Sequence, residues 1–453
     1  MASSKARSAP AFRCTECGWT AGKWVGRCGE CQAWGTVEQI GTPKLREVSA
    51  GSVTTPALPI GQIGVEAAKA EATGVAELDR VLGGGLVEGA VVLVAGEPGV
   101  GKSTLLLDVA AKVAESGGTV LYITGEESAA QVRLRAGRVG ALANTLYLAA
   151  ESDLSAVVAH IEAVLPTLLI VDSIQTIASP DVDGGAGGVT QVREVAGALI
   201  RIAKQRGLST VLVGHVTKDG GIAGPRVLEH LVDVVLQFEG ERDNSLRMIR
   251  ASKNRYGPTD EVGCFELTDT GILELPDPSG LFLTRRDEPV PGTCVTVTLE
   301  GRRPLVAEVQ ALVGLSTLNT PRRATSGLDS ARTAMVLAVL ERRGGVSLAP
   351  HDVYAATVGG VRLTEPSVDL AVALAVASAA SDLMMWPGLV ALGEVGLAGE
   401  LRSVPGLERR LSEAARLGFT HAIVPTGTSP QIPDGMRVLQ AGDIKAALRA
   451  ALP

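Results

Sequence analysis

The sequence predicts an α/β protein whose largest part is a mostly parallel sheet covered by helices. Two Cys-x-x-Cys pairs lie near the N-terminus, and a glycine-rich loop of the pattern GxxxxGKS follows an apolar run at residues 90–95. From residue 73 to about 275, strand-like apolar runs alternate with helical patterns, which is typical of parallel strands joined by helices. After residue 280, hairpin-like strands precede helices and predict a separate α+β region.

Length and composition limit the classes of protein to consider. The chain has 453 residues, of which 46% are hydrophobic and 20% charged, so at about 150 residues per domain it holds roughly two to four domains. The longest mostly apolar stretch, 370–380, is far shorter than the ~20 residues that span a bilayer, and no secretory pattern precedes Cys14. We therefore expect a cytoplasmic protein without a membrane partner. The net charge of −7 argues against a chain that is basic throughout, although nucleic-acid binding depends on local patches.

The N-terminal cysteines have the spacing of a zinc ribbon. They form two Cys-x-x-Cys turns separated by ten residues: Cys14, Cys17, Cys28 and Cys31. Each turn directs two sulfurs at one point, and two turns complete the tetrahedral shell of a structural Zn²⁺. Disulfides are the alternative, which a reducing cytosol disfavours. Cys264 and Cys294 stand alone in apolar segments, and we interpret both as core residues.

Domain limits follow from changes in composition and periodicity. We assign the zinc ribbon to residues 10–37, a linker to 38–72, the α/β core to 73–279 and the C-terminal region to 280–453. The strands expected in the core are Val91–Ala95, Val120–Thr124, Leu168–Asp172, Thr210–His215, Val232–Phe238 and Met248–Ala251. The elements expected in the C-terminal region are strands at Cys294–Leu299 and Leu305–Val313 and helices at Ser330–Arg342 and Ser367–Ala380.

The glycine-rich loop predicts a nucleoside triphosphate site. Its residues are Gly96, Glu97, Pro98, Gly99, Val100, Gly101, Lys102 and Ser103, followed by Thr104. Glycines let backbone N–H groups surround the α and β phosphates, Lys102 reaches the β and γ oxygens, and the Ser103 hydroxyl binds Mg²⁺. The helix expected at Thr104–Ala114 turns its N-terminal dipole toward the phosphates. A glycine-rich turn without a ligand is the alternative, but strand, loop, Lys-Ser pair and helix coincide here.

Acidic residues at two strand ends complete the expected hydrolytic site. Asp172 ends an apolar run, as does the carboxylate that orients Mg²⁺ opposite a phosphate loop. Glu126 and Glu127 follow the strand that ends at Thr124, and we assign Glu126 as general base, with Glu127 as its neighbour or substitute. A helix N-terminus that attracts acidic residues is the alternative for this pair. His215 ends another strand and either senses the γ-phosphate or has a structural role.

Two glycine-rich segments, Asp181–Val189 and Lys218–Pro225, follow the strands that end in Asp172 and His215. Ligands bind beyond the carboxyl ends of parallel strands, so ATP turnover would move these segments against a polymer in a central channel. We assign DNA contacts to Lys218 and Arg226. Since the segments carry no aromatic side chain, we expect contact with the phosphate backbone rather than base reading.

Several motifs occur in the order found in one family. The zinc ribbon, GEPGVGKS, GEES, GHVTKDG and Lys253-Asn254-Arg255-Tyr256-Gly257 resemble the family of bacterial RadA (Sms) DNA repair proteins, which are RecA-superfamily ATPases. The pentad is similar to that family's KNRFG motif, with Tyr256 in place of Phe. The longer stretch Lys253-x-Arg255-x-Gly257-Pro258-Thr259 is also similar to the segment by which hexameric replicative helicases present a Lys and an Arg to the neighbouring subunit's ATP. The resemblance implies that Lys253 and Arg255 act across a subunit interface, and a solvated basic turn is the alternative.

The resemblance covers nearly the whole chain and implies an activity. The implied protein has a RecA-like ATPase core and is a DNA-dependent ATPase that translocates on single-stranded or branched DNA and promotes branch migration of recombination intermediates. The resemblance further implies ATP, Mg²⁺ and Zn²⁺, a recombinase such as RecA as partner, and a homo-oligomeric, hexameric ring. A nucleotide-switched scaffold similar to clock ATPases is a weaker alternative.

The C-terminal region resembles the proteolytic domain of Lon. Glu365–Asp369 and Gly393–Glu400 match the neighbourhoods of Lon's nucleophilic Ser and general-base Lys, and Ser367 takes the nucleophile's position. The second segment continues into Arg409-Arg410 without a lysine, and a permanently charged Arg does not replace a neutral amine. We expect a peptidase-like fold that is catalytically inactive and serves assembly. The competing function is an ATP-dependent Lon-like serine protease. The arginine pairs of this region either line a DNA path or are ordinary solvated surface: Arg302-Arg303, Arg322-Arg323, Arg342-Arg343 and Arg409-Arg410.

Overall fold

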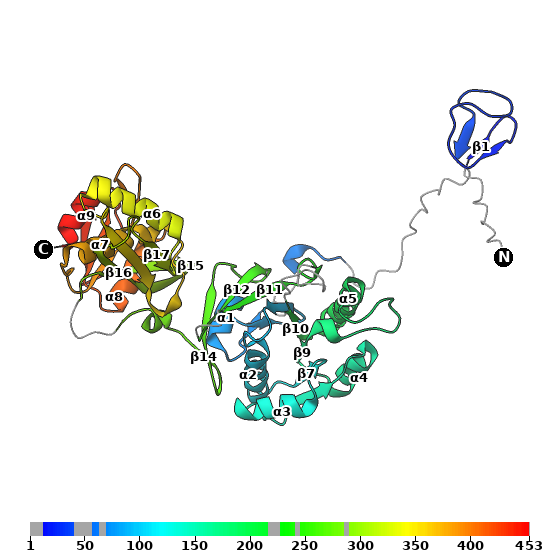
Figure 1. The fold of residues 1–453 in the computed structure, drawn as a ribbon. Coiled ribbons are helices and arrows are strands. Elements are labelled where there is room, and N and C mark those ends of the chain that lie inside the picture. The colour runs from blue at the N-terminus through cyan, green and yellow to red at the C-terminus, as the bar shows by residue number, and fades with distance from the viewer. Residues whose placement is uncertain are drawn as a thin grey trace. The chain divides into compact units, whose positions relative to one another are not determined.

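The computed structural model describes residues 12–39, 57–62, 69–215, 227–240, 245–284 and 290–452. They fall into two compact units, residues 1–64 and 65–453 (Figure 1). The first unit contains a three-stranded sheet in the order β2-β1-β3, with β1 Phe12–Cys14, β2 Thr20–Ala21 and β3 Val37–Gln39. A short turn of helix follows at Ile60–Gln62. The assigned DNA contacts, Lys218 and Arg226, and the segment 218–225 lie outside the described residues.

The second unit begins with a nine-stranded sheet in the order β14-β13-β12-β11-β6-β10-β9-β7-β8. Strands β6 to β11 run parallel, and β12, β13 and β14 continue the sheet antiparallel. The strands are β6 Val91–Gly96, β7 Val120–Thr124, β8 Leu146–Ala150, β9 Leu168–Asp172, β10 Ser209–His215, β11 Val234–Gly240, β12 Leu246–Asn254, β13 Val262–Thr268 and β14 Gly271–Glu274. A two-stranded ribbon, β4 Ala70–Glu71 and β5 Leu86–Val87, precedes it.

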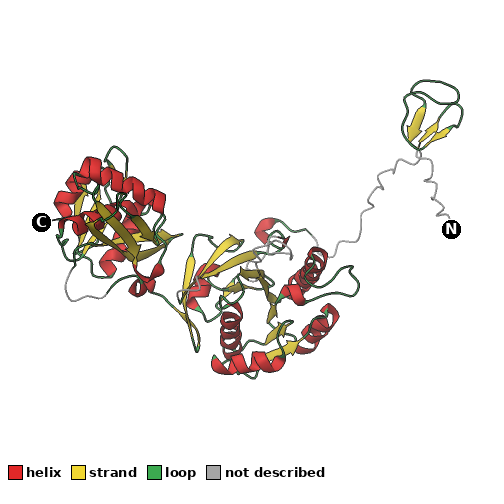
Figure 2. Cartoon of the chain, viewed as in Figure 1, coloured by secondary structure: helices red, strands yellow, loops and turns green. Residues whose placement is uncertain are grey.

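Helices cover both faces of this sheet (Figure 2). They are α1 Ala76–Leu82, α2 Lys102–Glu115, α3 Ala129–Arg138, α4 Leu154–Val164 and α5 Val189–Arg206. Alternate residues of β6 face opposite cores: Val92 and Val94 pack with α1, α2 and α3, whereas Val91 and Leu93 pack with α4 and α5. Each such buried side chain contributes roughly 1.5–3 kcal/mol, and burial on both faces explains why β6 is a continuous apolar run.

The C-terminal part of the second unit is a seven-stranded sheet in the order β17-β18-β16-β15-β19-β22-β23. Its strands are β15 Thr293–Glu300, β16 Arg303–Leu315, β17 Arg323–Ser326, β18 His351–Thr357, β19 Leu389–Ala391, β22 His421–Pro425 and β23 Arg437–Ala441. A separate ribbon pairs β20 Glu394–Val395 with β21 Leu401–Arg402. Helices α6 Ser330–Val339, α7 Asp369–Ser381 and α9 Ile444–Ala451 share one core, and α8 Leu407–Arg416 belongs to another.

The strands and helices predicted from the sequence are confirmed, and most of their ends are shifted by a few residues. Strands at Val120–Thr124 and Leu168–Asp172 have the predicted limits. The helix predicted at Ser330–Arg342 is α-helical to Val339 and continues as a π-turn at Leu340–Gly344. The domain limits at 73–279 and 280–453 stay a prediction. Among the described residues, no helix combines the length and apolar character that crossing a bilayer requires.

Arg303 is buried, so both interpretations of it from the sequence, part of a DNA path and ordinary solvated surface, are wrong. Its side chain is 7% exposed and forms an ion pair with Glu77 of α1. The guanidinium also donates hydrogen bonds to the carbonyls of Val262, Leu275 and Pro276 at 2.6–3.1 Å. A side chain of the C-terminal sheet is thereby tied to residues of the nine-stranded sheet and to α1. Cys264 and Cys294 are buried, which confirms their interpretation as core residues.

Candidate nucleotide-binding and hydrolytic site

The predicted phosphate loop connects β6 to the N-terminus of α2, as the sequence indicates. Gly99 and Gly101 have φ values of 82° and 109°, in the left-handed region that favours glycine. A Cβ at Gly96 would lie 2.5 Å from the carbonyl oxygen of Phe238, so the neighbouring strand β11 leaves no room for a side chain there. The loop thus turns its backbone toward the start of α2, where amide groups favour an anion.

Lys102 is a buried cation within this loop. Its side chain is 3% exposed, and Nζ donates hydrogen bonds of 2.9 Å to the carbonyls of Gly96 and Glu97. Burial lowers the pKa of Lys102 to about 8, while the negative charges of Asp172 and Glu126 act in the opposite direction. A nearby anion would favour the charged form, so this lysine is prepared to bind phosphate oxygens.

Asp172 is the last residue of β9, and β10 separates β9 from β6 in the sheet. The hydroxyl of Tyr122 on β7 donates a 2.7 Å hydrogen bond to Asp172 Oδ2. Burial first, and then the charge of Asp172, raises the pKa of Tyr122 well above its usual value, so the phenol stays protonated and remains a donor. The sequence did not mark Tyr122, because a tyrosine in a strand normally indicates only packing.

Glu126 lies beside Asp172, as the sequence predicts, with its side chain about half exposed. The hydroxyl of Ser173 donates a 2.7 Å hydrogen bond to Glu126 Oε1, and His215 Nε2 lies 3.3 Å from the same oxygen. Burial first, and then the charge of Lys102, lowers the pKa of His215, so its imidazole is neutral at pH 7. The structure brings together the lysine and both predicted carboxylates at the carboxyl edge of the sheet.

Glu127 points to a different partner from Glu126. Its carboxylate forms an ion pair with Arg135 of α3, and its backbone N–H donates to Thr124 Oγ1 at 3.2 Å. Ser128 then caps α3 with a capping box that includes Gln131. The alternative interpretation of an acidic helix start therefore suits Glu127, whereas Glu126 faces the phosphate loop.

Lys253 and Arg255 of the pentad both have partners within their own chain. Lys253 Nζ donates to the carbonyls of Glu229 and Val232 at 2.8 and 2.7 Å. Arg255 is 57% exposed and forms a 3.1 Å ion pair with Asp233. Burial, followed by the charge of Arg255, lowers the pKa of Lys253. Any partner in another subunit must therefore replace these contacts.

The middle and end of the pentad shape the turn. Asn254 Nδ2 donates to the carbonyl of Leu82 at 3.1 Å, and its Oδ1 accepts hydrogen bonds from the backbone of Tyr256 and Gly257 at 2.9 and 3.0 Å. A Cβ at Gly257 would lie 3.1 Å from the Cα of Gly83. Asn254 and Gly257 therefore fix the turn against the end of α1, and Tyr256 is partly exposed.

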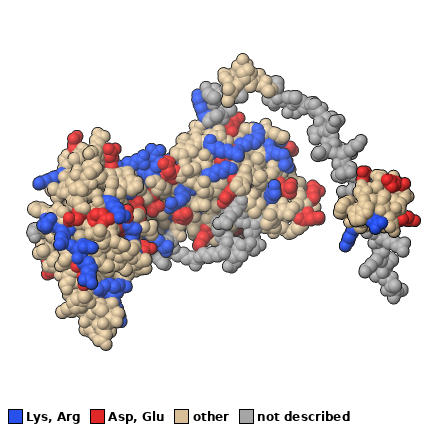
Figure 3. All heavy atoms as spheres, turned by 90° about the horizontal axis from the view of Figure 1, so that it is seen from above, with Lys and Arg blue, Asp and Glu red and all other residues tan. Residues whose placement is uncertain are grey.

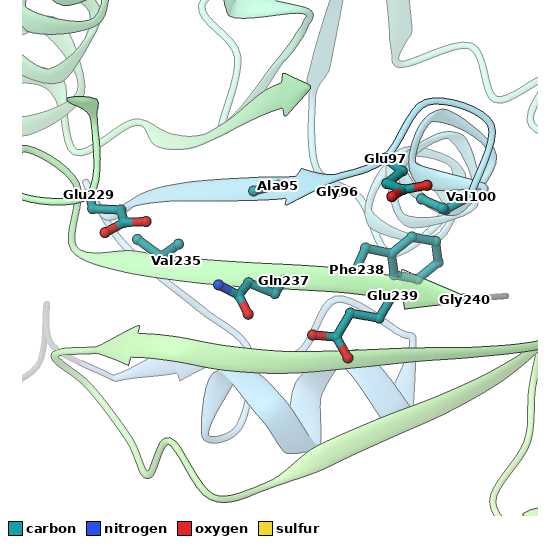
Figure 4. Close-up of a pocket in the computed structure, with 10 residues that line it drawn as sticks. All are labelled: Ala95, Gly96, Glu97, Val100, Glu229, Val235, Gln237, Phe238, Glu239 and Gly240. Atoms are coloured by element: carbon teal, nitrogen blue, oxygen red, sulfur yellow. The ribbon is translucent and has the colours of Figure 1, made fainter. Parts of the chain in front are cut away.

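A groove of about 380 Å³ adjoins the phosphate loop along β6 and β11 (Figure 4). Its polar lining includes Glu97, Glu229, Gln237 and Glu239, and three of these four side chains are carboxylates. A second side chain that the sequence analysis missed is Arg247, which is 7% exposed and donates to the carbonyl of Val100 in the loop at 3.1 Å. An arginine in a strand gave no signal of this role.

The predicted Lon-like nucleophile, Ser367, is buried in an ionic network. Its hydroxyl donates to Glu365 and accepts a 3.0 Å hydrogen bond from Arg410, which is 1% exposed. Arg410 also pairs with Glu365 and donates to the carbonyl of Val297 at 2.5 Å. Burial acts to raise the pKa of Glu365, but the hydrogen bonds from Arg410 and Ser367 outweigh burial, and the pKa is lowered. The guanidinium of Arg410 is buried and bonded to groups inside the domain, so Arg410 neither lines a DNA path nor belongs to the solvated surface.

The four N-terminal cysteines converge as predicted. Their sulfur atoms all lie within 4.8 Å of one another, and Cys14 and Cys28 are buried in the small core of the first unit. None of these four cysteines is joined to another in a disulfide. Four sulfurs at one point are a complete donor set for a tetrahedral metal ion.

Comparison with known proteins agrees with this organisation. Family models match residues 12–39 (a rubredoxin metal-binding domain), 57–221 (an AAA domain) and 341–428 (subunit ChlI of Mg-chelatase). The predicted zinc ribbon, RecA-like core with a mostly parallel sheet, and Lon-like C-terminal region are confirmed.

Curated relatives match over nearly the full length. DNA repair protein RadA of Mycolicibacterium smegmatis is 56% identical, and the match covers 99% of this chain and 98% of that protein. DNA repair protein RadA of Streptococcus pyogenes is 44% identical over 98% of this chain and 99% of the relative. A solved KaiC-like protein of Pyrococcus horikoshii OT3 covers 46% of this chain and 99% of its own, at 22% identity and a TM-score of 0.39. The chain belongs to the family of DNA repair protein RadA.

Proposed function

We propose that this chain is a DNA-dependent ATPase that translocates on single-stranded or branched DNA and promotes branch migration of recombination intermediates. The observation that carries the proposal is the convergence of Lys102, Asp172 and Glu126 at the carboxyl edge of one sheet. A cation for phosphates, a carboxylate for Mg²⁺ and a base for water are the groups that phosphoryl transfer to water requires. The family name supplies the link to DNA repair.

The residues fit ATP, Mg²⁺ and Zn²⁺. Gly96 to Thr104 would hold the phosphates, since the positive φ angles of Gly99 and Gly101 shape the loop and the buried Lys102 supplies a cation within it. Ser103 and Asp172 would hold Mg²⁺, which neutralises charge on the β and γ oxygens when bound. The four thiols suit Zn²⁺. Glu126 would accept a proton from the attacking water while Ser173 keeps its carboxylate in place.

Lys253 and Arg255 would act on the ATP of a neighbouring subunit in a hexameric ring. Arg255 is already exposed, and the carboxylates in the groove beside the phosphate loop complement an incoming cation pair. A fixed cation pair at the γ-phosphate would stabilise transition-state charge and couple hydrolysis to the interface. Glu127, paired with Arg135, serves as neighbour of the base.

DNA would be contacted through its phosphates, by Lys218 and Arg226 and by the loop at 181–189. On the face seen in Figure 3, basic side chains are interspersed with acidic ones. We propose that a local set of cations holds the strand through its phosphates. We further propose the domain limits given above, a recombinase such as RecA as partner, and a cytoplasmic location.

The C-terminal region would contribute to assembly and not to proteolysis. Ser367 is 2% exposed, and its hydroxyl lies between Arg410 and Glu365. A permanently charged guanidinium cannot accept the proton of the serine, and the carboxylate of Glu365, which accepts the serine's hydrogen bond, has a lowered pKa and is a weak base, so Ser367 lacks the neutral amine that would activate it.

ATP hydrolysis with and without single-stranded DNA, across a salt series, tests the proposal. We expect stimulation by DNA that weakens steeply as salt rises, because contacts with phosphates release counterions. Lys102→Ala is the matched control, and we expect it to abolish ATP hydrolysis both with and without DNA. Turnover that is unchanged by DNA in the wild type would contradict the proposed function.

A further inference from the structure

Two hydroxyl groups outside the phosphate-loop motifs hold the two carboxylates of the site. Tyr122 donates to Asp172 Oδ2, and Ser173 donates to Glu126 Oε1, each at 2.7 Å. We propose that Tyr122 and Ser173 are positioning residues with separate tasks: Tyr122 orients Asp172 for the metal, and Ser173 orients Glu126 for the attacking water. The inference rests on the proposed ATP hydrolysis and adds two residues to it.

Tyr122 is placed by strand pairing. It lies in the middle of β7, opposite Ile170 of β9, and its side chain is 1% exposed in the core. From this position the phenol reaches the carboxylate two residues further along β9 and engages Oδ2, so Asp172 can present Oδ1 to a metal ion. A hydrogen-bond donor that holds the other oxygen of a metal-binding carboxylate fixes its orientation, and loss of such a donor typically lowers metal affinity by about 10- to 100-fold.

Ser173 is fixed at the end of β9. It is fully buried, and its carbonyl accepts a 2.8 Å hydrogen bond from Thr176 Oγ1, which holds the segment after the strand. Glu126, in contrast, has a side chain that is 45% exposed. A half-exposed glutamate loses rotamer freedom only when something holds it. The bond from Ser173 provides that restraint.

The two tasks predict a double dissociation. Tyr122→Phe should raise the Mg²⁺ concentration needed for half-maximal binding of a fluorescent, non-hydrolysable ATP analogue by about 10- to 100-fold. At saturating Mg²⁺, its kcat should stay within about threefold of wild type, because Glu126 is still held. Ser173→Ala should lower kcat by about 10- to 100-fold, because a misplaced base rarely meets the water, and should leave the Mg²⁺ requirement unchanged.

Both measurements use the full-length protein, with control substitutions of the same chemistry. Tyr147→Phe removes an exposed phenol from the edge strand β8 of the same sheet, and Ser116→Ala removes a hydroxyl that donates to the carbonyl of Val113 at the end of α2. Both controls should match the wild type in the two measurements. Melting temperatures of all four variants establish whether they are folded.

The inference is overturned if either variant moves both parameters together, or if neither parameter moves. It is also overturned if Tyr122→Phe fails to fold, since the hydroxyl would then be a structural requirement. A wild type that binds Mg²⁺ and the analogue but hydrolyses no ATP would instead refute the proposed function. That result leaves the Mg²⁺ titration of Tyr122→Phe as an independent test of the role of Tyr122.

Discussion

Lys102 should make nucleotide binding depend on pH in the alkaline range. Without a ligand its pKa is lowered to about 8 by burial, against an ordinary value of 10.5. The triphosphate brings negative charge to Nζ and restores the protonated form, so binding raises the pKa of this lysine. A group whose pKa rises on binding takes up a proton, and affinity must therefore fall as pH rises above about 8.

The magnitude follows from the two pKa values. If the bound lysine returns to 10.5, the dissociation constant at pH 9 is about tenfold higher than at pH 7. The same values give an uptake of about 0.9 proton per nucleotide at pH 9 and about 0.1 at pH 7. His215 and Tyr122 do not titrate in this window, because the pKa of His215 is lowered from 6.5 and that of Tyr122 lies well above 10. The terminal phosphate of the nucleotide has a pKa of about 6 and is therefore already ionised from pH 7 to pH 9.

Isothermal titration calorimetry measures both quantities. Titrations of ATP analogue at pH 7, 8 and 9, in buffers with different ionisation enthalpies, give the dissociation constant and the proton uptake. Lys102→Arg is the matched control, because a guanidinium keeps its charge and should bind with an affinity that does not change with pH. A wild-type dissociation constant that stays within twofold from pH 7 to pH 9, without proton uptake, would refute the reasoning.

The remaining predictions concern three other sites. Arg410→Ala should destabilise the C-terminal region by about 3–5 kcal/mol in chemical denaturation, because it leaves Glu365 without its buried partner. Since the pKa of Glu365 is lowered in the fold, this stabilisation is present above its unfolded value of 4.5 and disappears as pH falls through the folded value; equal acid sensitivity of both proteins would contradict this. Cys28→Ser should remove zinc, measured by atomic absorption, and leave DNA-free ATP hydrolysis within about twofold, because the ribbon is a separate unit. Glu126→Gln should lower kcat by about 100-fold or more with nucleotide binding retained, whereas Glu127→Gln should cost less than about tenfold; the reverse order would exchange their roles.

The sequence predicted the frame of the site because each of its parts carries a recognisable local pattern in the chain. The phosphate loop, its strand and its helix are contiguous, and β9 is an apolar run that ends in Asp172. Continuous apolar runs of this length indicate strands buried on both faces, so the predicted limits of these strands were close to the observed ones.

The supporting residues were not predictable, since they meet only in the folded sheet. Tyr122 and Asp172 are 50 residues apart, and Glu126 and Ser173 are 47 apart. Neither hydroxyl has a sequence pattern that distinguishes it from ordinary packing. The interpretations of Arg303 and Arg410 from the sequence were wrong for another reason. A buried arginine and a solvated one look the same in sequence, and only the carbonyls and carboxylates around them in the fold distinguish the two.

The central claim is that each ATP is hydrolysed with cations from a neighbouring subunit, and mixing two inactive variants tests it most directly. Lys102→Ala lacks the phosphate-loop cation, and Arg255→Ala lacks the exposed cation of the pentad. A mixed oligomer contains interfaces where an intact phosphate loop meets an intact Arg255. We predict that the mixture regains DNA-stimulated ATP hydrolysis while each variant alone is inactive. A mixture as inactive as its components would contradict the claim.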